Sequence, residues 1–129
     1  MSDLQTKLTT KGENMTQDTL MTKEEQLGLD EYQYLANRTA DYIHPIYPFM
    51  LLHEEAGELS AQFTKVKLRG DDRPIDMVAA KKELGDCLWA VAEIATQLGF
   101  SLESVARANL SKLEDRAARG QIKGSGDNR

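Results

Sequence analysis

Apolar residues recur every three or four positions over most of the chain beyond residue 28, which is the spacing of a helix with one buried face. The segment from Tyr47 to Leu68 carries one such stripe, made of Leu52, Ala56, Leu59, Phe63 and Val66. A second stripe lies between about Ile75 and Leu98 and consists of Ala80, Leu84, Cys87, Val91, Ile94 and Leu98. The pattern predicts two long helices, each with one packed face.

Two further helices are predicted on either side of this pair. The first runs from Asp30, which is a suitable N-cap, to Ile43, and it ends because Pro45 follows. The last begins after Ser101, also a suitable N-cap. Its predicted buried face is Leu102, Ala106, Leu110, Leu113 and Ala117.

The connections between the helices carry turn residues. The segment 69–74 is rich in Gly, Asp and Pro and predicts a turn, while Gly99 predicts the end of the third helix. No Asn-Gly hairpin signal is present. The sequence therefore predicts an all-α, four-helix bundle over residues 27–119. We expect residues 1–26 to be a flexible extension and residues 120–129 to be a Gly-rich tail.

Composition narrows the class of protein. A chain of 129 residues with 40% hydrophobic residues suits a single domain with a real core. Its net charge of −5 disfavours a general nucleic-acid or anionic-membrane binder. The longest apolar run, residues 87–92, is far shorter than the roughly 20 residues of a membrane span. With one cysteine and no signal segment, we expect a cytoplasmic protein.

Charge is unevenly distributed along the chain. Residues 1–60 hold four basic and eleven acidic side chains, whereas residues 104–129 hold six basic and three acidic ones. Such asymmetry suits self-association, or a site that binds metal cations and phosphate anions together. Solvated helix faces are the simpler explanation unless the spacing of particular residues argues otherwise.

Two acidic pairs at i, i+3 spacing provide that argument. Glu55 and Glu58 share a face of the second helix, and Glu83 and Asp86 share a face of the third. If these helices form an antiparallel hairpin, a centre at Gly70–Asp71 pairs Glu55 with Asp86 and Glu58 with Glu83. Four carboxylates at one level would repel one another, so one or two hard divalent cations are the expected partners.

The fourth helix supplies complementary groups. Asn109, Lys112 and Arg116 share one helix face. Antiparallel packing of the last two helices about residues 99–101 would bring Lys112 level with Asp86 and Arg116 level with Glu83. Carboxylates for a metal, together with an amide and two cations for phosphate oxygens, indicate phosphate chemistry.

These motifs resemble a known family. Residues 51–59 (LLHEEAGEL) followed by residues 82–89 (KELGDCLW) resemble the ExxE…ExxD signature of MazG-like nucleoside triphosphate pyrophosphohydrolases. The 24 residues between the two pairs suit that family, and residues 109–116, 119–120 and 124–129 resemble a small single-domain subgroup. The resemblance covers about residues 29–129. The extension 1–26 has no counterpart in the family pattern.

The resemblance implies an all-α, MazG-like bundle completed as a homodimer or homotetramer, and hydrolysis of a (d)NTP to (d)NMP and pyrophosphate. It also implies Mg²⁺, with Mn²⁺ as the alternative, bound by Glu55, Glu58, Glu83 and Asp86. Glu54 has either a water-activating or supporting role, or none. The implied phosphate and sugar contacts are Asn109, Lys112 and Arg116, and Arg129 is a further candidate if the tail covers the phosphates.

Other functions stay open at this point. A dUTPase or a phosphoribosyl-ATP pyrophosphatase would share similar chemistry. A nucleotide-binding module that does not hydrolyse its ligand is a second class, although its acidic quartet should be damaged. A purely structural dimerisation protein is a third, and it would make the carboxylate register accidental.

Overall fold

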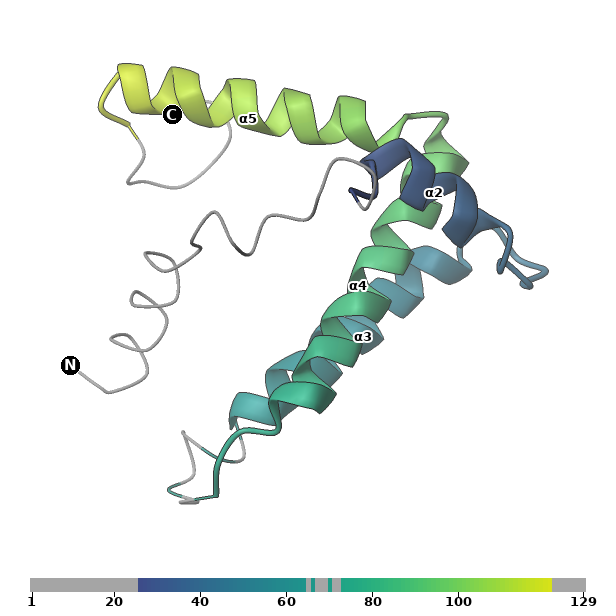
Figure 1. The fold of residues 1–129 in the computed structure, drawn as a ribbon, viewed down its shortest axis with the longest axis vertical. Helices are drawn as coiled ribbons and strands as arrows, with labels where there is room; N and C mark the ends of the chain where they lie inside the picture. The colour runs from purple at the N-terminus through teal and green to yellow at the C-terminus, as the bar shows by residue number, and fades with distance from the viewer. Residues whose placement is uncertain (1–25, 65, 67–69, 71–72, 122–129) are drawn as a thin grey trace.

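The computed structural model of the protein describes residues 26–64, 66, 70 and 73–121. In this part of the chain it is helical, with helices α2 (Leu29–Asn37), α3 (Tyr47–Phe63), α4 (Met77–Leu98) and α5 (Leu102–Ala118) and no strand. Figure 1 shows these helices in chain order, from α2 in dark blue to α5 in yellow-green. The predicted all-α fold is confirmed.

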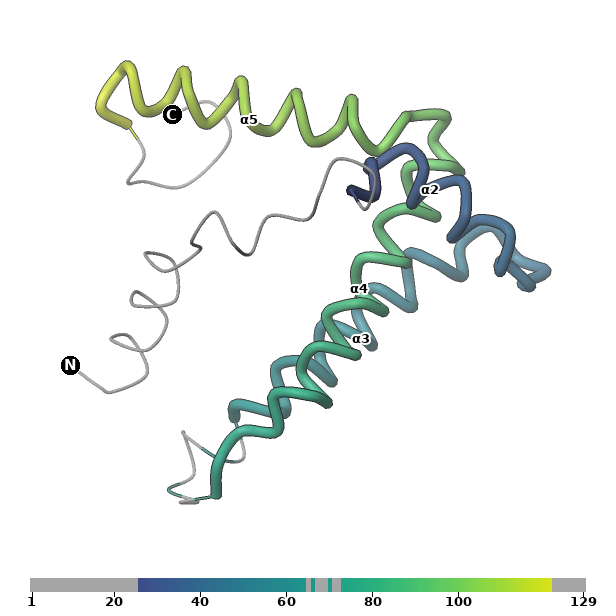
Figure 2. The backbone as a smooth tube through the Cα atoms, in the orientation of Figure 1, coloured from purple at the N-terminus to yellow at the C-terminus, as the bar shows by residue number. Residues whose placement is uncertain are grey.

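Helices α3 and α4 form the central hairpin. They run in opposite directions and lie side by side, as the tube trace in Figure 2 shows. Helix α2 packs against α4 and also contacts the start of α5. Helix α5 then diverges from the hairpin, so that Figure 1 shows an open V between α5 and α4. None of the described residues of α5 contacts α3.

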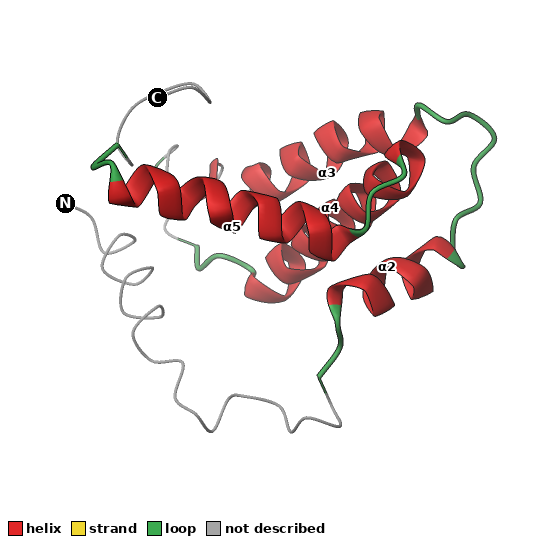
Figure 3. Cartoon of the chain, turned by 90° about the horizontal axis from the view of Figure 1, so that it is seen from above, coloured by secondary structure: helices red, strands yellow, loops and turns green. Residues whose placement is uncertain are grey.

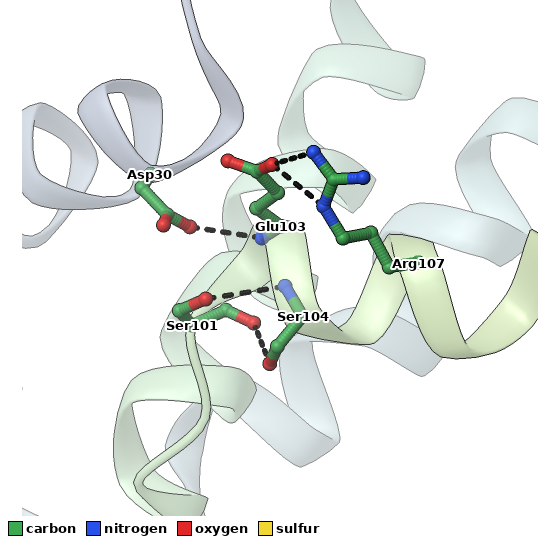
Figure 4. Close-up of polar contacts among 5 residues, drawn as sticks. All are labelled: Asp30, Ser101, Glu103, Ser104 and Arg107. Atoms are coloured by element: carbon green, nitrogen blue, oxygen red, sulfur yellow. Dashed lines mark hydrogen bonds and ion pairs between the residues drawn. The ribbon is translucent and has the colours of Figure 1, made fainter.

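The ends of α4 and the start of α5 follow from local sequence. The Asp76 carboxylate accepts hydrogen bonds from the backbone N–H groups of Val78 (3.0 Å) and Ala79 (2.9 Å), and so caps α4. Gly99 ends α4 with a φ of 76°, a left-handed conformation that glycine adopts without a Cβ clash. The Ser101 hydroxyl accepts from the Ser104 N–H at 3.1 Å and caps α5 (Figure 4). The predicted helix end at Gly99 and the predicted N-cap at Ser101 are therefore confirmed.

The first predicted helix is longer than the one observed. Helix α2 ends at Asn37 and not at Ile43, because the next residues turn: the Thr39 N–H and hydroxyl both bond to the Ala36 carbonyl, at 2.9 and 2.7 Å. The α-helical part of α3 ends at Phe63, and Thr64 and Val66 beyond it are still helical, of the π type. The last predicted residues, 67 and 68, lie outside the described part of the chain.

Asp30 is not an N-cap, since Gly28 occupies that position in α2. The Asp30 carboxylate instead accepts a hydrogen bond from the Glu103 N–H at 2.8 Å, in the first turn of α5 (Figure 4). The same turn holds an ion pair between Glu103 and Arg107. Asp30 therefore joins two helices that are far apart in sequence.

The buried core lies where α2, α4 and α5 meet. It contains Ala92, Ala95 and Leu102, with Tyr32 and Val91 packed against them. The predicted stripes are buried only in part, because Leu84 and Leu98 on α4 and Leu110 and Leu113 on α5 are exposed. Seen from above in Figure 3, α5 extends past the hairpin as a separate rod. Its divergence from α4 explains why these leucines lack the predicted cover.

No helix in the described part of the chain combines the length and the apolarity that a membrane span requires.

Candidate functional site

An acidic cluster lies between α3 and α4. Glu55 and Glu58 are one helical turn apart on α3, and Glu83 approaches them from the antiparallel α4. One carboxylate oxygen from each of the three lies within 4.8 Å of the others. Glu55 and Glu83 are half-buried, whereas Glu58 is exposed. The hairpin thus brings three of the four predicted carboxylates together.

The negative charges in this cluster act on one another. The pKa of Glu55 is raised, first because burial disfavours its charged form and then because of the charges on Asp86, Glu58 and Glu83. Glu54, the exposed neighbour of Glu55, adds a smaller effect of the same sign. Asp86 is not part of the group formed by Glu55, Glu58 and Glu83. Among the neighbouring charges, however, that of Asp86 has the largest effect on the pKa of Glu55.

The cluster also affects the single cysteine. Burial, followed by the charges of Glu55, Asp86 and Glu83, raises the pKa of the Cys87 thiol. A thiol with a raised pKa stays protonated at neutral pH and is a poor nucleophile. The chemistry of this site therefore belongs to its carboxylates.

Three converging carboxylates form a donor set that fits a hard divalent cation. Mg²⁺ and Mn²⁺ favour oxygen ligands, and Mg²⁺ is commonly held by a few carboxylates together with water. Positive charge placed among Glu55, Glu58 and Glu83 would relieve the repulsion that adds to the effect of burial in raising the pKa of Glu55. The roles of Glu54 and Asp86 toward such an ion stay predictions.

The predicted phosphate-binding residues of α5 are not next to this cluster within one chain. Asn109 and Lys112 line an open hollow of about 540 Å³ together with Phe100, Ser104, Val105 and Ala108. The predicted antiparallel packing of the last two helices is wrong, because α5 leaves α4 at Gly99 and diverges. Arg116 is only 5% exposed, and Arg129 lies outside the described residues.

A second carboxylate site was not predicted from the sequence. Glu93 on α4 is fully buried. Its carboxylate accepts hydrogen bonds from the Asn37 amide (3.2 and 3.4 Å) and the Tyr42 hydroxyl (3.0 Å). The Gln97 amide donates in turn to the Tyr42 oxygen at 2.8 Å. The only signal in the sequence is that Glu93 lies seven residues after Asp86, on the same face of α4.

Aromatic side chains surround this buried carboxylate. Tyr42 stacks on Tyr47 with ring centroids 5.3 Å apart and meets the edge of Trp89 at 6.3 Å. The Trp89 indole N–H donates to the Thr39 hydroxyl at 2.9 Å. The pKa of Tyr32 is raised by burial first, and then by the charges of Asp86 and Glu93. Charges from both sites, Asp86 beside the acidic cluster and the buried Glu93, thus act on the Tyr32 hydroxyl.

Comparison with known proteins adds information on ancestry. Residues 49–120 match the MazG nucleotide pyrophosphohydrolase domain. The chain is also 41% identical over 113 residues to the Gene 37 protein of Mycobacterium phage L5. The aligned region covers 78% of this chain and 98% of the phage protein. No solved structure matches the chain. The residues matched to the domain include the acidic cluster and α5.

Proposed function

The chain belongs to the MazG nucleotide pyrophosphohydrolase family, and on that basis we propose that it is a Mg²⁺-dependent enzyme that cleaves a (d)NTP to (d)NMP and pyrophosphate. Such an activity would remove unwanted nucleotides from the cellular pool. The observation that supports the proposal best is the acidic cluster, in which oxygens of Glu55, Glu58 and Glu83 lie within 4.8 Å of one another.

The proposed metal ligands are Glu55, Glu58, Glu83 and Asp86, with Mg²⁺ as the ion and Mn²⁺ as the alternative. When bound, the ion supplies positive charge that polarises the phosphate oxygens. The close approach of Glu55, Glu58 and Glu83, which α3 and α4 carry, supports this assignment, because carboxylates that are already grouped need little rearrangement to bind an ion.

Glu54 is the proposed proton acceptor, since its charge acts on Glu55 and its side chain is exposed to water. A water molecule gives its proton to Glu54 as its oxygen attacks phosphorus. The new P–O bond forms while the bond between the α- and β-phosphates breaks, and pyrophosphate leaves with the electron pair of that bond. Asn109, Lys112, Arg116 and Arg129 are the proposed contacts to phosphate and sugar.

The direct test is the identity of the products. Purified protein is incubated with each (d)NTP in Mg²⁺ or in EDTA, and nucleotides and pyrophosphate are quantified separately. We expect equal amounts of (d)NMP and pyrophosphate in Mg²⁺ and neither in EDTA. Release of orthophosphate and a nucleoside diphosphate would contradict the proposal.

The same assay, with phosphoribosyl-ATP added to the (d)NTPs, separates the alternatives. Turnover of dUTP alone would identify a dUTPase, and turnover of phosphoribosyl-ATP alone would identify that pyrophosphatase activity. Nucleotide binding without any product would indicate a non-catalytic binding module. Sedimentation of the purified protein tests the expected homodimer or homotetramer independently of activity.

A further inference from the structure

The buried carboxylate of Glu93 determines how the side-chain amide of Asn37 is oriented. Both carboxylate oxygens accept from Asn37 Nδ2, at 3.2 and 3.4 Å. Because a carboxylate accepts and an amide has one donor end and one acceptor end, the NH₂ group of Asn37 must face Glu93. The reverse orientation would place an amide oxygen against a fully buried carboxylate. The Asn37 side chain is exposed, so its Oδ1 is presented to solvent as a hydrogen-bond acceptor.

The amide of Gln97 is oriented in the same way, through Tyr42. The Tyr42 hydroxyl donates to Glu93 at 3.0 Å, so its oxygen accepts from Gln97 Nε2 at 2.8 Å. Gln97 Oε1 is thereby turned away from Tyr42, on an exposed side chain. Among the residues that the structure describes, none donates a hydrogen bond to either amide oxygen. One buried carboxylate thus orients two amides so that each presents an acceptor.

These groups lie along the face of α4 that leads to the acidic site. Helical spacings of three or four residues connect Asp86, Ala90, Glu93 and Gln97. The charges of Asp86 and Glu93 both raise the pKa of the Tyr32 hydroxyl, so the two carboxylates lie on the same side of the helix. Seven residues of α4 separate them, which is about 10 Å. A ribose and a base can extend over that distance from phosphates held at the acidic site.

The two directions along the hairpin from the acidic cluster differ in chemistry. Toward the start of α4, a hollow of about 270 Å³ beside Arg73 and Asp76 has no aromatic side chain among its described lining residues. Toward the end of α4, Trp89 meets Tyr42, and Tyr47 stacks on Tyr42 while remaining 44% exposed. Aromatic rings bind nucleobases by stacking. The base of a bound nucleotide is therefore expected toward the end of α4, where the oriented amides lie.

We propose that Asn37 Oδ1 accepts a hydrogen bond from an exocyclic amino group of the base, and that Glu93 is the positioning residue that turns this oxygen outward. The inference rests on the proposed function and names the class of substrate, namely a (d)NTP whose base carries an amino group. Cytosine presents an N4 amino donor at the position where uracil and thymine present the O4 acceptor. An outward acceptor pairs with the first and repels the second, so dCTP should be preferred over dUTP.

Comparison of dCTP with dUTP tests the proposal, because these substrates differ only at C4 and the adjacent N3. In the pyrophosphate assay, we expect kcat/KM of the wild type to be at least about ten-fold higher for dCTP. Asn37→Ala removes the acceptor and should bring the two kcat/KM values close together. Glu93→Gln gives Asn37 Oδ1 an inward donor, so its NH₂ group can turn outward and the dCTP/dUTP ratio should fall at least about ten-fold.

The ratio separates recognition from stability, because partial unfolding of a variant lowers the turnover of both substrates equally. Glu31→Gln, at an exposed carboxylate on α2, is the matched control and should keep the wild-type ratio. A wild type that does not prefer dCTP would overturn the proposal. An Asn37→Ala variant with the wild-type ratio would overturn it as well.

Calorimetry with dCMP and dUMP provides a readout that does not need turnover. We expect the wild type to bind dCMP at least about ten-fold more tightly than dUMP, and Asn37→Ala to bind both with similar affinity. Equal affinity of the wild type for both, or no binding of either, would overturn the inference. A wild type that prefers dCMP but releases no pyrophosphate from dCTP would refute the proposed function and not the role of Asn37.

Discussion

The buried carboxylate of Glu93 is predicted to hold the non-helical segment after α2 against α4. Glu93 is fully buried, and its partners are the neutral side chains of Asn37 and Tyr42. Replacing it with alanine removes the acceptor from both donors. Because the two donors come from different parts of the segment 37–42, their loss should loosen the attachment of that segment as a whole.

The magnitude follows from the hydrogen bonds. A hydrogen bond to a charged group contributes about 1.5 kcal/mol or more, so two of them contribute about 3 kcal/mol. Asn37 is exposed and Tyr42 is half-buried, so both donors recover part of this energy by binding water. We expect Glu93→Ala to lower the free energy of unfolding by about 2 kcal/mol. In a domain of this size that corresponds to a Tm lower by about 8 °C.

Thermal unfolding followed by circular dichroism measures this change, with Asp115→Ala as the matched control. Asp115 also accepts hydrogen bonds, from Arg119 four residues away, but this ion pair is exposed and should contribute less than about 0.5 kcal/mol. Glu93→Gln keeps one acceptor oxygen, so its Tm should lie between those of Glu93→Ala and Asp115→Ala. A Tm for Glu93→Ala within about 2 °C of the control would refute the reasoning that buried hydrogen bonds outweigh the cost of burying the charge.

Three further predictions concern helix ends and the acidic cluster. Asp76→Ala removes the cap of α4 and should cost about 1 kcal/mol, measured by urea unfolding, whereas Asp76→Asn should cost less. Gly99→Ala places a Cβ at a φ of 76° and should lower the free energy of unfolding by about 1 kcal/mol, which urea unfolding also measures. Saturating Mg²⁺ should raise the Tm of the wild type in thermal unfolding, because the ion binds the folded cluster; an equal Tm in Mg²⁺ and EDTA would argue against a metal site.

Much of the hairpin could be predicted from the sequence. Periodicity identified α3 and α4, because each has enough turns for its apolar stripe to stand out, and a turn near Gly70 set their register. Since carboxylates at i, i+3 follow the same period, the convergence of Glu55, Glu58 and Glu83 could be anticipated as well. The boundary between α4 and α5 could also be predicted, because Gly99 ends α4 and Ser101 caps α5 through contacts within a few residues of the sequence.

The direction of α5 could not be predicted in this way. It is fixed by Gln33 and Asp30, which bind backbone groups about 70 residues further along the chain, and no periodic pattern reports such contacts. Glu93 was missed for a related reason. A carboxylate on a helix is normally exposed, and only the fold shows that Asn37 and Tyr42 enclose this one.

The central claim is that the acidic cluster is the metal-dependent catalytic site, and its most direct test is pyrophosphate release by Glu58→Gln and Asp86→Asn. Each substitution removes a negative charge with almost no change of shape. We expect kcat/KM in Mg²⁺ to fall at least about 100-fold in each variant, with a Tm in EDTA no lower than that of the wild type. Glu114→Gln, at an exposed carboxylate on α5, is the control and should keep full activity. Near-normal Mg²⁺-dependent pyrophosphate release by either Glu58→Gln or Asp86→Asn would contradict the account.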